Sequence, residues 1–295
     1  MTDAQFIPLT DRGIVSLSGD DSTGFLQGLV TNDVATVSAD RAIYAALLTP
    51  QGKYLHDFFV LRSGDGLYLD CDAHRIEDLV RRLSRYRLRA KVTIEDASDR
   101  FRLFALFGEA ALQRVGLTAD EGRAGSFADG IVFVDPRNAA LGGRAVLPGG
   151  NGAQRLEAAG LSPSDRQAYD MLRMSLGIAA GDPEMEPEKS FPMEYGLDTH
   201  HGVSFTKGCY VGQEVTVRMK TRGLVRKRLV PVRIDGSAPQ VGAELQIGSK
   251  AAGELRAACG AAGLALVRIE ALEQALADGS PFEAGTARFY PRMPS

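Results

Sequence analysis

The chain has 295 residues, 44% of them hydrophobic and 24% charged, and its 34 basic and 37 acidic side chains give a net charge of −3. This length suits about two domains of ~150 residues, and the balanced charge argues against nucleic acid as a direct ligand. Because no apolar run approaches the ~20 residues of a membrane span and Met1–Gln5 lacks signal-peptide features, we expect a cytoplasmic protein without membrane association.

The first 95 residues predict the order strand, helix, three strands, helix, strand. Apolar runs bounded by turn residues mark the strands, and apolar residues at helical spacing mark the helices. These elements fall at residues 13–18, 22–30, 42–48, 54–61, 67–71, 76–83 and 92–94.

A second block repeats part of this order. Its strands and helices are expected at residues 102–107, 110–115, 131–135, 144–147 and 153–159, and Ser162-Pro163-Ser164-Asp165 is expected to begin a longer helix. Two such blocks predict an α+β fold of two ferredoxin-like, split β-α-β units, with helices on one face of antiparallel sheets.

The last part of the chain changes in composition near Gly223. Short runs rich in Val, Ala and Gly predict strands at residues 230–234, 244–247, 253–259, 264–268 and 285–289. Closely spaced short strands are typical of a small β-barrel or sandwich. We therefore divide the chain into an α+β region at 1–223, with subunits 1–97 and 98–223, and a C-terminal barrel at 224–295.

The segment Lys207-Gly208-Cys209-Tyr210-Val211-Gly212-Gln213-Glu214, here called the signature segment, concentrates reactive groups. Its two glycines suggest a tight bend or a close backbone approach that presents Cys209 on a turn. A nearby ammonium, such as that of Lys207, favours the reactive thiolate form of cysteine. The alternative is that Cys209 is a small buried apolar residue, as many free cysteines are.

The signature segment resembles the K-G-C-Y-x-G-Q-E motif of the YgfZ family. These are folate-binding proteins of iron–sulfur cluster assembly or repair, and they share a fold with the glycine-cleavage T-protein, an aminomethyltransferase. Seven fixed residue types in eight positions make the motif specific. The resemblance implies the T-protein type of α+β fold, a C-terminal barrel, and tetrahydrofolate or another reduced folate as cofactor.

The resemblance also implies site residues. Glu194, in Pro192-Met193-Glu194-Tyr195-Gly196, is similar to the carboxylate that binds the pteridine ring, for which paired hydrogen bonds suit a carboxylate; the alternative is a solvated loop residue. Arg173, Tyr210, Gln213 and Asp57 are further folate-binding candidates. Asp57 follows His56 where the transferase has paired aspartates, so the sequence departs from the transferase at its catalytic group.

Two other patterns bear on partners. The three cysteines, Cys71, Cys209 and Cys259, have no C-x-x-C spacing, so we expect reduced thiols and no zinc or self-contained cluster, with a ligand shared with a partner left open. Residues 207–228 contain seven basic side chains and one acid, a local charge of +6 that would attract an anion or, alternatively, guard a strand edge against aggregation.

These observations support three functions. The first is a folate-binding accessory factor for iron–sulfur client enzymes, including tRNA-modifying radical enzymes, in which Cys209 and Lys207 carry the chemistry. The second is a tetrahydrofolate-dependent aminomethyl or methyl transferase, for which Asp57 is the candidate carboxylate. The third is a binding scaffold without folate, which does not explain the density of the signature segment.

Overall fold

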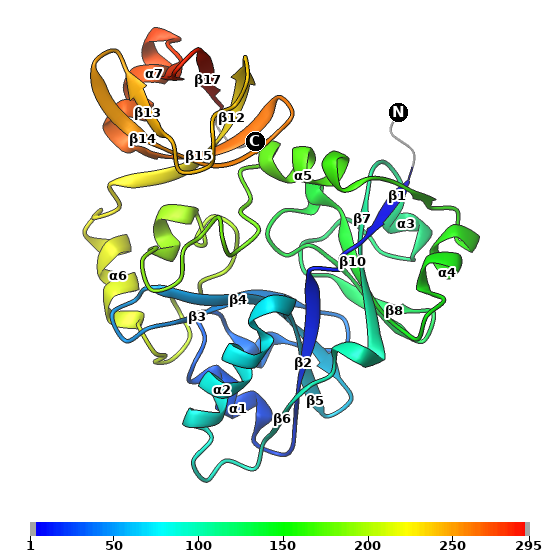
Figure 1. Cartoon of the computed structure of the whole chain (residues 1–295). Helices are drawn as coiled ribbons and strands as arrows, with labels where there is room; N and C mark the ends of the chain where they lie inside the picture. Colours follow the sequence, from blue (N-terminus) through cyan, green and yellow to red (C-terminus); the bar gives the residue numbers. More distant parts are fainter. Residues whose placement is uncertain (1–3, 293–295) are drawn as a thin grey trace.

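The computed structural model describes residues 4–292 (Figure 1). A first, five-stranded antiparallel sheet has the order β3-β4-β5-β2-β6. Its strands are β2 (Arg12–Ser18), β3 (Ile43–Leu48), β4 (Tyr54–Ser63), β5 (Gly66–Asp72) and β6 (Thr93–Asp96). The helices α1 (Ser22–Gln27) and α2 (Ile76–Tyr86) cover one face, where Ile76, Leu79 and Leu83 of α2 are buried at the predicted helical spacing.

A second sheet has the order β11-β1-β7-β10-β9-β8, and only the β1–β11 pair among its ladders is parallel. Its strands are β1 (Gln5–Pro8), β7 (Phe101–Phe107), β8 (Ala124–Phe127), β9 (Gly130–Val134), β10 (Gly143–Pro148) and β11 (Ser162–Pro163). The short helices α3 (Ala111–Arg114) and α4 (Gly152–Ala158) pack on its outer face.

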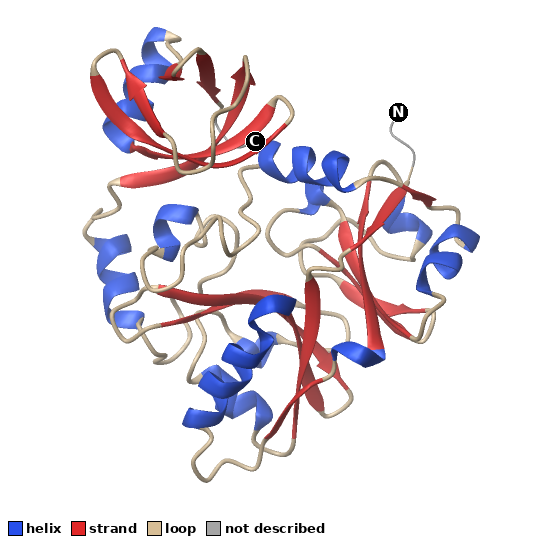
Figure 2. Ribbon diagram, viewed as in Figure 1, coloured by secondary structure: helices blue, strands red, loops and turns tan. Residues whose placement is uncertain are grey.

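The inner faces of the two sheets share one core. Alternation along the strands sends Tyr44 and Phe59 inward from the first sheet, and Phe133 inward from the second. The rings of Phe59 and Phe133 meet with centroids 5.5 Å apart. The α+β region is therefore two sheets that share a core, with helices on their outer faces (Figure 2).

After the second sheet the chain runs through α5 (Arg166–Ser175), a long irregular segment containing the turn η5 (Pro192–Tyr195), and α6 (Gln213–Thr221). Shorter 3-10 turns lie elsewhere in the α+β region. These are η1 (Val34–Thr36), η2 (Ala73–Arg75), η3 (Ser98–Arg100) and η4 (Ala139–Leu141).

The C-terminal part is a closed barrel of the order β12-β15-β14-β13-β16-β17, with α7 (Ile269–Asp278) outside it (Figure 2). The strands are β12 (Lys227–Asp235), β13 (Glu244–Ile247), β14 (Lys250–Cys259), β15 (Ala262–Arg268), β16 (Phe282–Ala284) and β17 (Ala287–Pro291). Closure leaves no open edge in this sheet.

The predicted fold class is confirmed, with local corrections. Ser162-Pro163 do not begin a helix but form β11, and α5 begins after Asp165, whose carboxylate accepts from the N–H of Ala168. The strand predicted at 285–289 spans the turn between β16 and β17. Strands β1 and β8 and helix α7 were not predicted, and β1 joins the second sheet, although residues 1–97 were expected to form the first unit.

Candidate functional site

The signature segment lies in the turn before α6 and in the first residues of that helix. Gly212 precedes the helix with φ of +84°, and a Cβ there would lie 2.6 Å from the carbonyl oxygen of Thr49. Gly208 differs, because a Cβ there would meet nothing within 4 Å. The predicted turn that presents Cys209 is present, and of the two glycines Gly212 is the one whose backbone requires glycine.

Lys207 is buried and anchors the segment to the end of α1. Its Nζ donates to the carbonyl oxygens of Gln27, Val30 and Asn32, each at 2.7 Å. Burial lowers the pKa of Lys207 to about 8, so the ammonium is still charged at pH 7. Its three N–H donors are taken by carbonyl groups, which is a different use from the thiolate contact expected with Cys209.

Cys209 is a free cysteine with an exposed side chain, whereas Cys71 is buried and Cys259 is half-buried. Burial raises the pKa of both Cys71 and Cys259. Accessibility is the condition for a thiol to reach a partner or an external reagent. The fold therefore presents Cys209, rather than the other two cysteines, to other molecules.

Tyr210 and Gln213 flank the turn. The Tyr210 ring is buried, with Lys207 Nζ 5.3 Å from its centroid, and its hydroxyl has no hydrogen-bond partner among residues 4–292. Burial raises the pKa of Tyr210 to about 12, so the phenol is neutral. Gln213 is partly exposed as the first residue of α6.

Glu194 lies in η5, against which α6 packs. Its side chain is half-buried and makes no hydrogen bond or ion pair within the described part of the chain. Burial raises the pKa of Glu194, although the charges of Lys227 and Lys53 oppose that effect. A carboxylate that has lost water without gaining a partner is suited to an incoming hydrogen-bond donor.

Asp57 is buried on the inner face of the first sheet. The hydroxyls of Tyr44 and Tyr54 donate to its two oxygens at 3.0 and 2.7 Å. Its neighbour His56 faces the opposite side and bonds Asp78 at 2.9 Å, and burial lowers the pKa of His56 to about 4. The two tyrosines were not identified from the sequence, although their place on adjacent strands facing inward could have indicated them.

Arg173 is buried on α5 and is not available as a free ligand in this conformation. Its guanidinium makes a bidentate pair with Glu184 at 2.8 and 2.9 Å and donates to the carbonyl oxygen of Ile178 at 2.6 Å. Glu184 belongs to the acidic loop, defined here as Gly181–Glu188. The expected folate contact of Arg173 would require this ion pair to open.

The acidic loop is held by arginines from three parts of the fold. Besides the Arg173 pair, three ion pairs hold it. Arg75 pairs with Asp182 at 3.5 Å, Arg82 pairs with Glu188 at 2.9 Å, and Arg256 of the barrel pairs with Glu186 at 2.8 Å. Arg256 also donates to the carbonyl oxygens of Glu184 and Pro183. The loop is thus fixed although it lacks regular structure.

A buried charge network joins the two sheets. Asp70 accepts from Arg12 at 2.7 Å and from Arg144 at 3.0 Å, and Asp135 pairs with Arg137 at 2.8 Å. Arg144 reaches Asp135 at 3.6 Å, yet its Nε has no hydrogen-bond partner among residues 4–292. Sequence reasoning missed these residues, since they come from strands far apart in the chain.

The basic stretch from residue 207 to 228 is less free than its sequence suggested. Asp198, from the preceding loop, pairs with Lys220 at 3.0 Å and with Arg228 at 3.4 Å, and Glu214 pairs with Arg218. The local charge of +6 is therefore partly compensated by neighbours in space.

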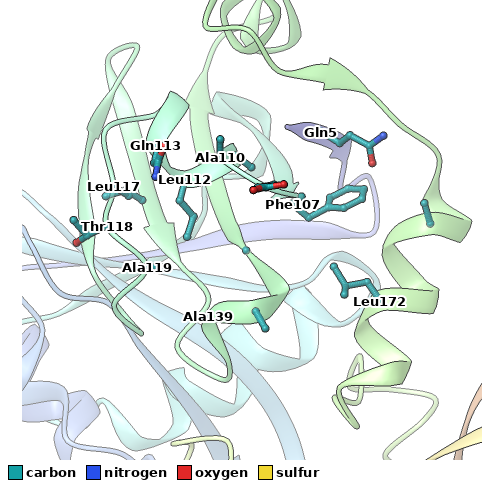
Figure 3. Close-up of a pocket in the computed structure, with 16 residues that line it drawn as sticks. Gln5, Phe107, Ala110, Leu112, Gln113, Leu117, Thr118, Ala119, Ala139 and Leu172 are labelled. Carbon is teal, nitrogen blue, oxygen red and sulfur yellow. The ribbon is translucent and has the colours of Figure 1, made fainter. Parts of the chain in front are cut away.

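Cavities of the α+β region differ in size. A cavity of about 710 Å³ lies beside α3, away from the predicted site residues (Figure 3). One of about 400 Å³, lined by Gly196, His200 and Arg228, lies where the barrel meets the α+β region. The space at Arg173 between the two sheets is about 20 Å³, enough for one water molecule but not for a pteridine.

Among residues 4–292, no three His, Cys, Asp or Glu side chains are grouped so that they could hold a metal ion. No helix in that range is long and apolar enough to cross a membrane.

Comparison with known proteins first defines the class. Residues 2–141 match the GCVT N-terminal domain, and residues 226–295 match the CAF17 C-terminal beta-barrel domain. The fold is similar to that in the crystal structure of glycine cleavage system aminomethyltransferase T from Bartonella henselae, with a TM-score of 0.76, 15% identity, and coverage of 98% of this chain and 84% of that one. At this identity the likeness concerns the fold alone.

The particular family follows from closer relatives. The chain is 33% identical over 287 residues to the iron-sulfur cluster assembly factor IBA57, mitochondrial, of Mus musculus, covering 90% of this chain and 78% of the relative. It is 32% identical over 318 residues to the IBA57 homolog, mitochondrial, of Pyricularia oryzae, covering 97% and 78%. The chain belongs to the IBA57 family of iron–sulfur cluster assembly factors.

Two predictions are corrected by these relatives. The resemblance to YgfZ holds at the level of related families, because the relatives are IBA57 proteins. The expected cytoplasmic location is wrong, because the relatives are named as mitochondrial. Composition and the lack of a long apolar run do not encode a compartment, so they could not support that expectation.

Proposed function

We propose that this chain binds tetrahydrofolate or another reduced folate and serves the assembly or repair of iron–sulfur clusters in client enzymes, including tRNA-modifying radical enzymes. The observation that carries the folate part is the half-buried Glu194 carboxylate without a partner among residues 4–292. A pterin offers adjacent N–H donors that pair with a carboxylate. A bound tetrahydrofolate would supply a carrier of one-carbon groups.

The surroundings of Glu194 suit an anionic ligand that also carries an aromatic ring. Lys53 and Lys227 are close enough to lower its pKa, and the Lys53 ammonium lies 3.2 Å from the centroid of the Phe191 ring. The cavity of about 400 Å³, which is within the size range of small-molecule sites, is lined by the nearby Gly196 but not by Glu194 itself. Glu194 would orient the ring, and the lysines would be available to carboxylates of the ligand.

Calorimetric titration with tetrahydrofolate tests this assignment. We expect Glu194→Gln to weaken binding by about 2 to 4 kcal/mol, because one partner of a charge-assisted pair is lost. Glu254→Gln is the matched control, since Glu254 is a neighbouring carboxylate that already lies 3.4 Å from Arg256. If Glu194→Gln binds tetrahydrofolate with unchanged affinity, Glu194 is not part of the site. If the natural chain does not bind tetrahydrofolate, the folate part of the proposal is wrong.

The exposed Cys209 thiol supports a role toward the client rather than toward the fold. It could ligate a cluster together with a partner, exchange with a disulfide, or contact the folate. For the first two roles we expect Cys209→Ser to keep folate affinity while lowering the activity of cluster-dependent enzymes in cells, whereas weaker folate binding would indicate the third. Normal client activity in that variant would leave Cys209 without this function.

An aminomethyltransferase activity is not favoured, because the Asp57 carboxylate already accepts two tyrosine hydroxyls. We expect no methylenetetrahydrofolate when the chain is mixed with the other glycine-cleavage components. Clear product formation would make transfer the leading function instead.

A further inference from the structure

The segment that joins α2 to β6 forms a basic tip, defined here as residues 84–91. It lies at the end of the molecule opposite the barrel (Figure 1). The tip is ordered by backbone bonds, because Arg87 N–H donates to the Ser84 carbonyl and Ala90 N–H to the Arg87 carbonyl. The N–H of Lys91 donates to the Asp21 carboxylate at 2.8 Å, which ties the tip to the start of α1.

Leu88 is the most exposed large apolar residue of the described chain. Its exposed fraction is 90%, and Tyr86 beside it is 42% exposed. Leu88 also has φ of +41°, a region that an L residue with a side chain enters at a cost. Folding alone would favour glycine here, as it does at the 20 other left-handed positions that glycine occupies among residues 4–292.

The leucine is surrounded by cations without acidic partners. Arg85, Arg87, Arg89 and Lys91 are exposed, and none of them has a carboxylate within 4.0 Å in the described range. One turn earlier, Arg82 is paired with Asp78 at 2.7 Å. The tip therefore combines one protruding apolar side chain with four uncompensated positive charges.

We propose that the basic tip docks a partner protein whose surface has a small apolar recess rimmed by carboxylates. Leu88 would fill the recess, and the arginines would pair with the rim, a geometry in which guanidinium groups bind carboxylates bidentately. A phosphate backbone offers no apolar recess, and a fluid bilayer does not require a leucine held at one backbone geometry. The inference does not rest on folate binding or on Cys209.

Site-specific crosslinking tests the proposal. The photoreactive residue p-benzoylphenylalanine is placed at position 88 of the full chain in cells and, as a control, at position 276, where Leu276 is 42% exposed on α7. The protein crosslinked at position 88 is identified and purified, and its affinity for the natural chain and for variants is measured at low and high salt. The proposal is supported only if substitutions in the basic tip weaken the affinity of the chain for the crosslinked protein.

We expect Leu88→Gly to weaken that affinity at least about tenfold while leaving thermal stability equal or higher, because glycine suits the backbone. Arg87→Gln with Arg89→Gln should weaken binding and reduce its salt dependence. The proposal is overturned if position 88 gives no more product than position 276, or if the variants bind equally well. It is also overturned if Leu88 instead governs binding to phosphatidylcholine vesicles with 30% phosphatidylglycerol or to a 20-nucleotide RNA.

Discussion

The acidic loop and the signature segment are both irregular, but they differ in how they are held and in what they expose. Four arginines from α5, the barrel and the α2 region hold the acidic loop. The signature segment is held by Lys207 and by the close approach of Gly212, and it leaves Cys209 exposed. Paired charges fix the loop that leads to Glu194, whereas the thiol stays accessible for an exchange with another molecule.

The strongest test of this contrast is the Arg173–Glu184 pair. We expect Arg173→Met to lower the free energy of unfolding by about 3 to 5 kcal/mol, because it leaves a buried carboxylate without its cation. Guanidinium chloride unfolding measures the loss. Arg166→Met is the control, since the Arg166 pairs are exposed and should contribute about 1 kcal/mol or less. Equal effects of the two variants would show that burial of the pair is not what holds the loop.

Lys207 tests the anchor of the signature segment. Lys207→Met leaves three carbonyl oxygens without their shared donor, and we expect a loss of about 2 to 3 kcal/mol in urea unfolding. Cleavage near residues 203–212 by a nonspecific protease should become faster. Lys220→Met, at an exposed lysine, is the control. A Lys207 variant as stable as that control would contradict the anchoring role.

Acid should lower the stability of the fold through His56, which bonds Asp78 of α2. Its folded pKa of about 4 is below the ordinary 6.5, so the unfolded state binds a proton first as pH falls. Stability is therefore lost between about pH 6.5 and 4, by roughly 1 to 3 kcal/mol. Urea midpoints at pH 7 and 4.5 measure this loss, and His56→Gln should reduce it. If His56→Gln loses as much stability between pH 7 and 4.5 as the natural chain does, the pH dependence comes from other groups.

The smallest expected effect on stability is that of Cys209. Cys209→Ser should change the free energy of unfolding by no more than about 0.5 kcal/mol, as for most exposed positions. Iodoacetamide should label Cys209 before Cys259 and Cys71, because burial raises the pKa of those two thiols and limits access. Equal labelling rates, followed by mass spectrometry, would contradict this order.

Local patterns carried most of the fold prediction. Periodicity identified α2 and the β3–β4–β5 meander, because their burial follows the spacing of apolar residues in the sequence. It failed at Ser162-Pro163, where parallel pairing with β1 decides the structure. Such pairing depends on residues more than 150 positions away, which a local window does not contain.

The site was predictable only where a motif stands together in the chain. The turn that presents Cys209 before α6 follows from adjacent residues, whereas the folate role of Glu194, inferred from its own short motif, stays a prediction. The Glu184 partner of Arg173 could not be read in this way, because it comes from a separate loop, and Tyr44, one of the two partners of Asp57, comes from the neighbouring strand. The partner of a charged side chain is determined by residues that the fold brings close to it, and these need not be close in sequence.

Strand β1 has a consequence for how the protein is made. Gln5 pairs with Phe107 of β7 and with Ser162 of β11, so the first sheet is inserted in sequence between strands of the second. During synthesis the first sheet can form from residues 12–96 before the strands that pair with β1 have been made. The first sheet should therefore assemble before the second. A fragment that starts at residue 98 would leave β7 and β11 as bare edges and should aggregate.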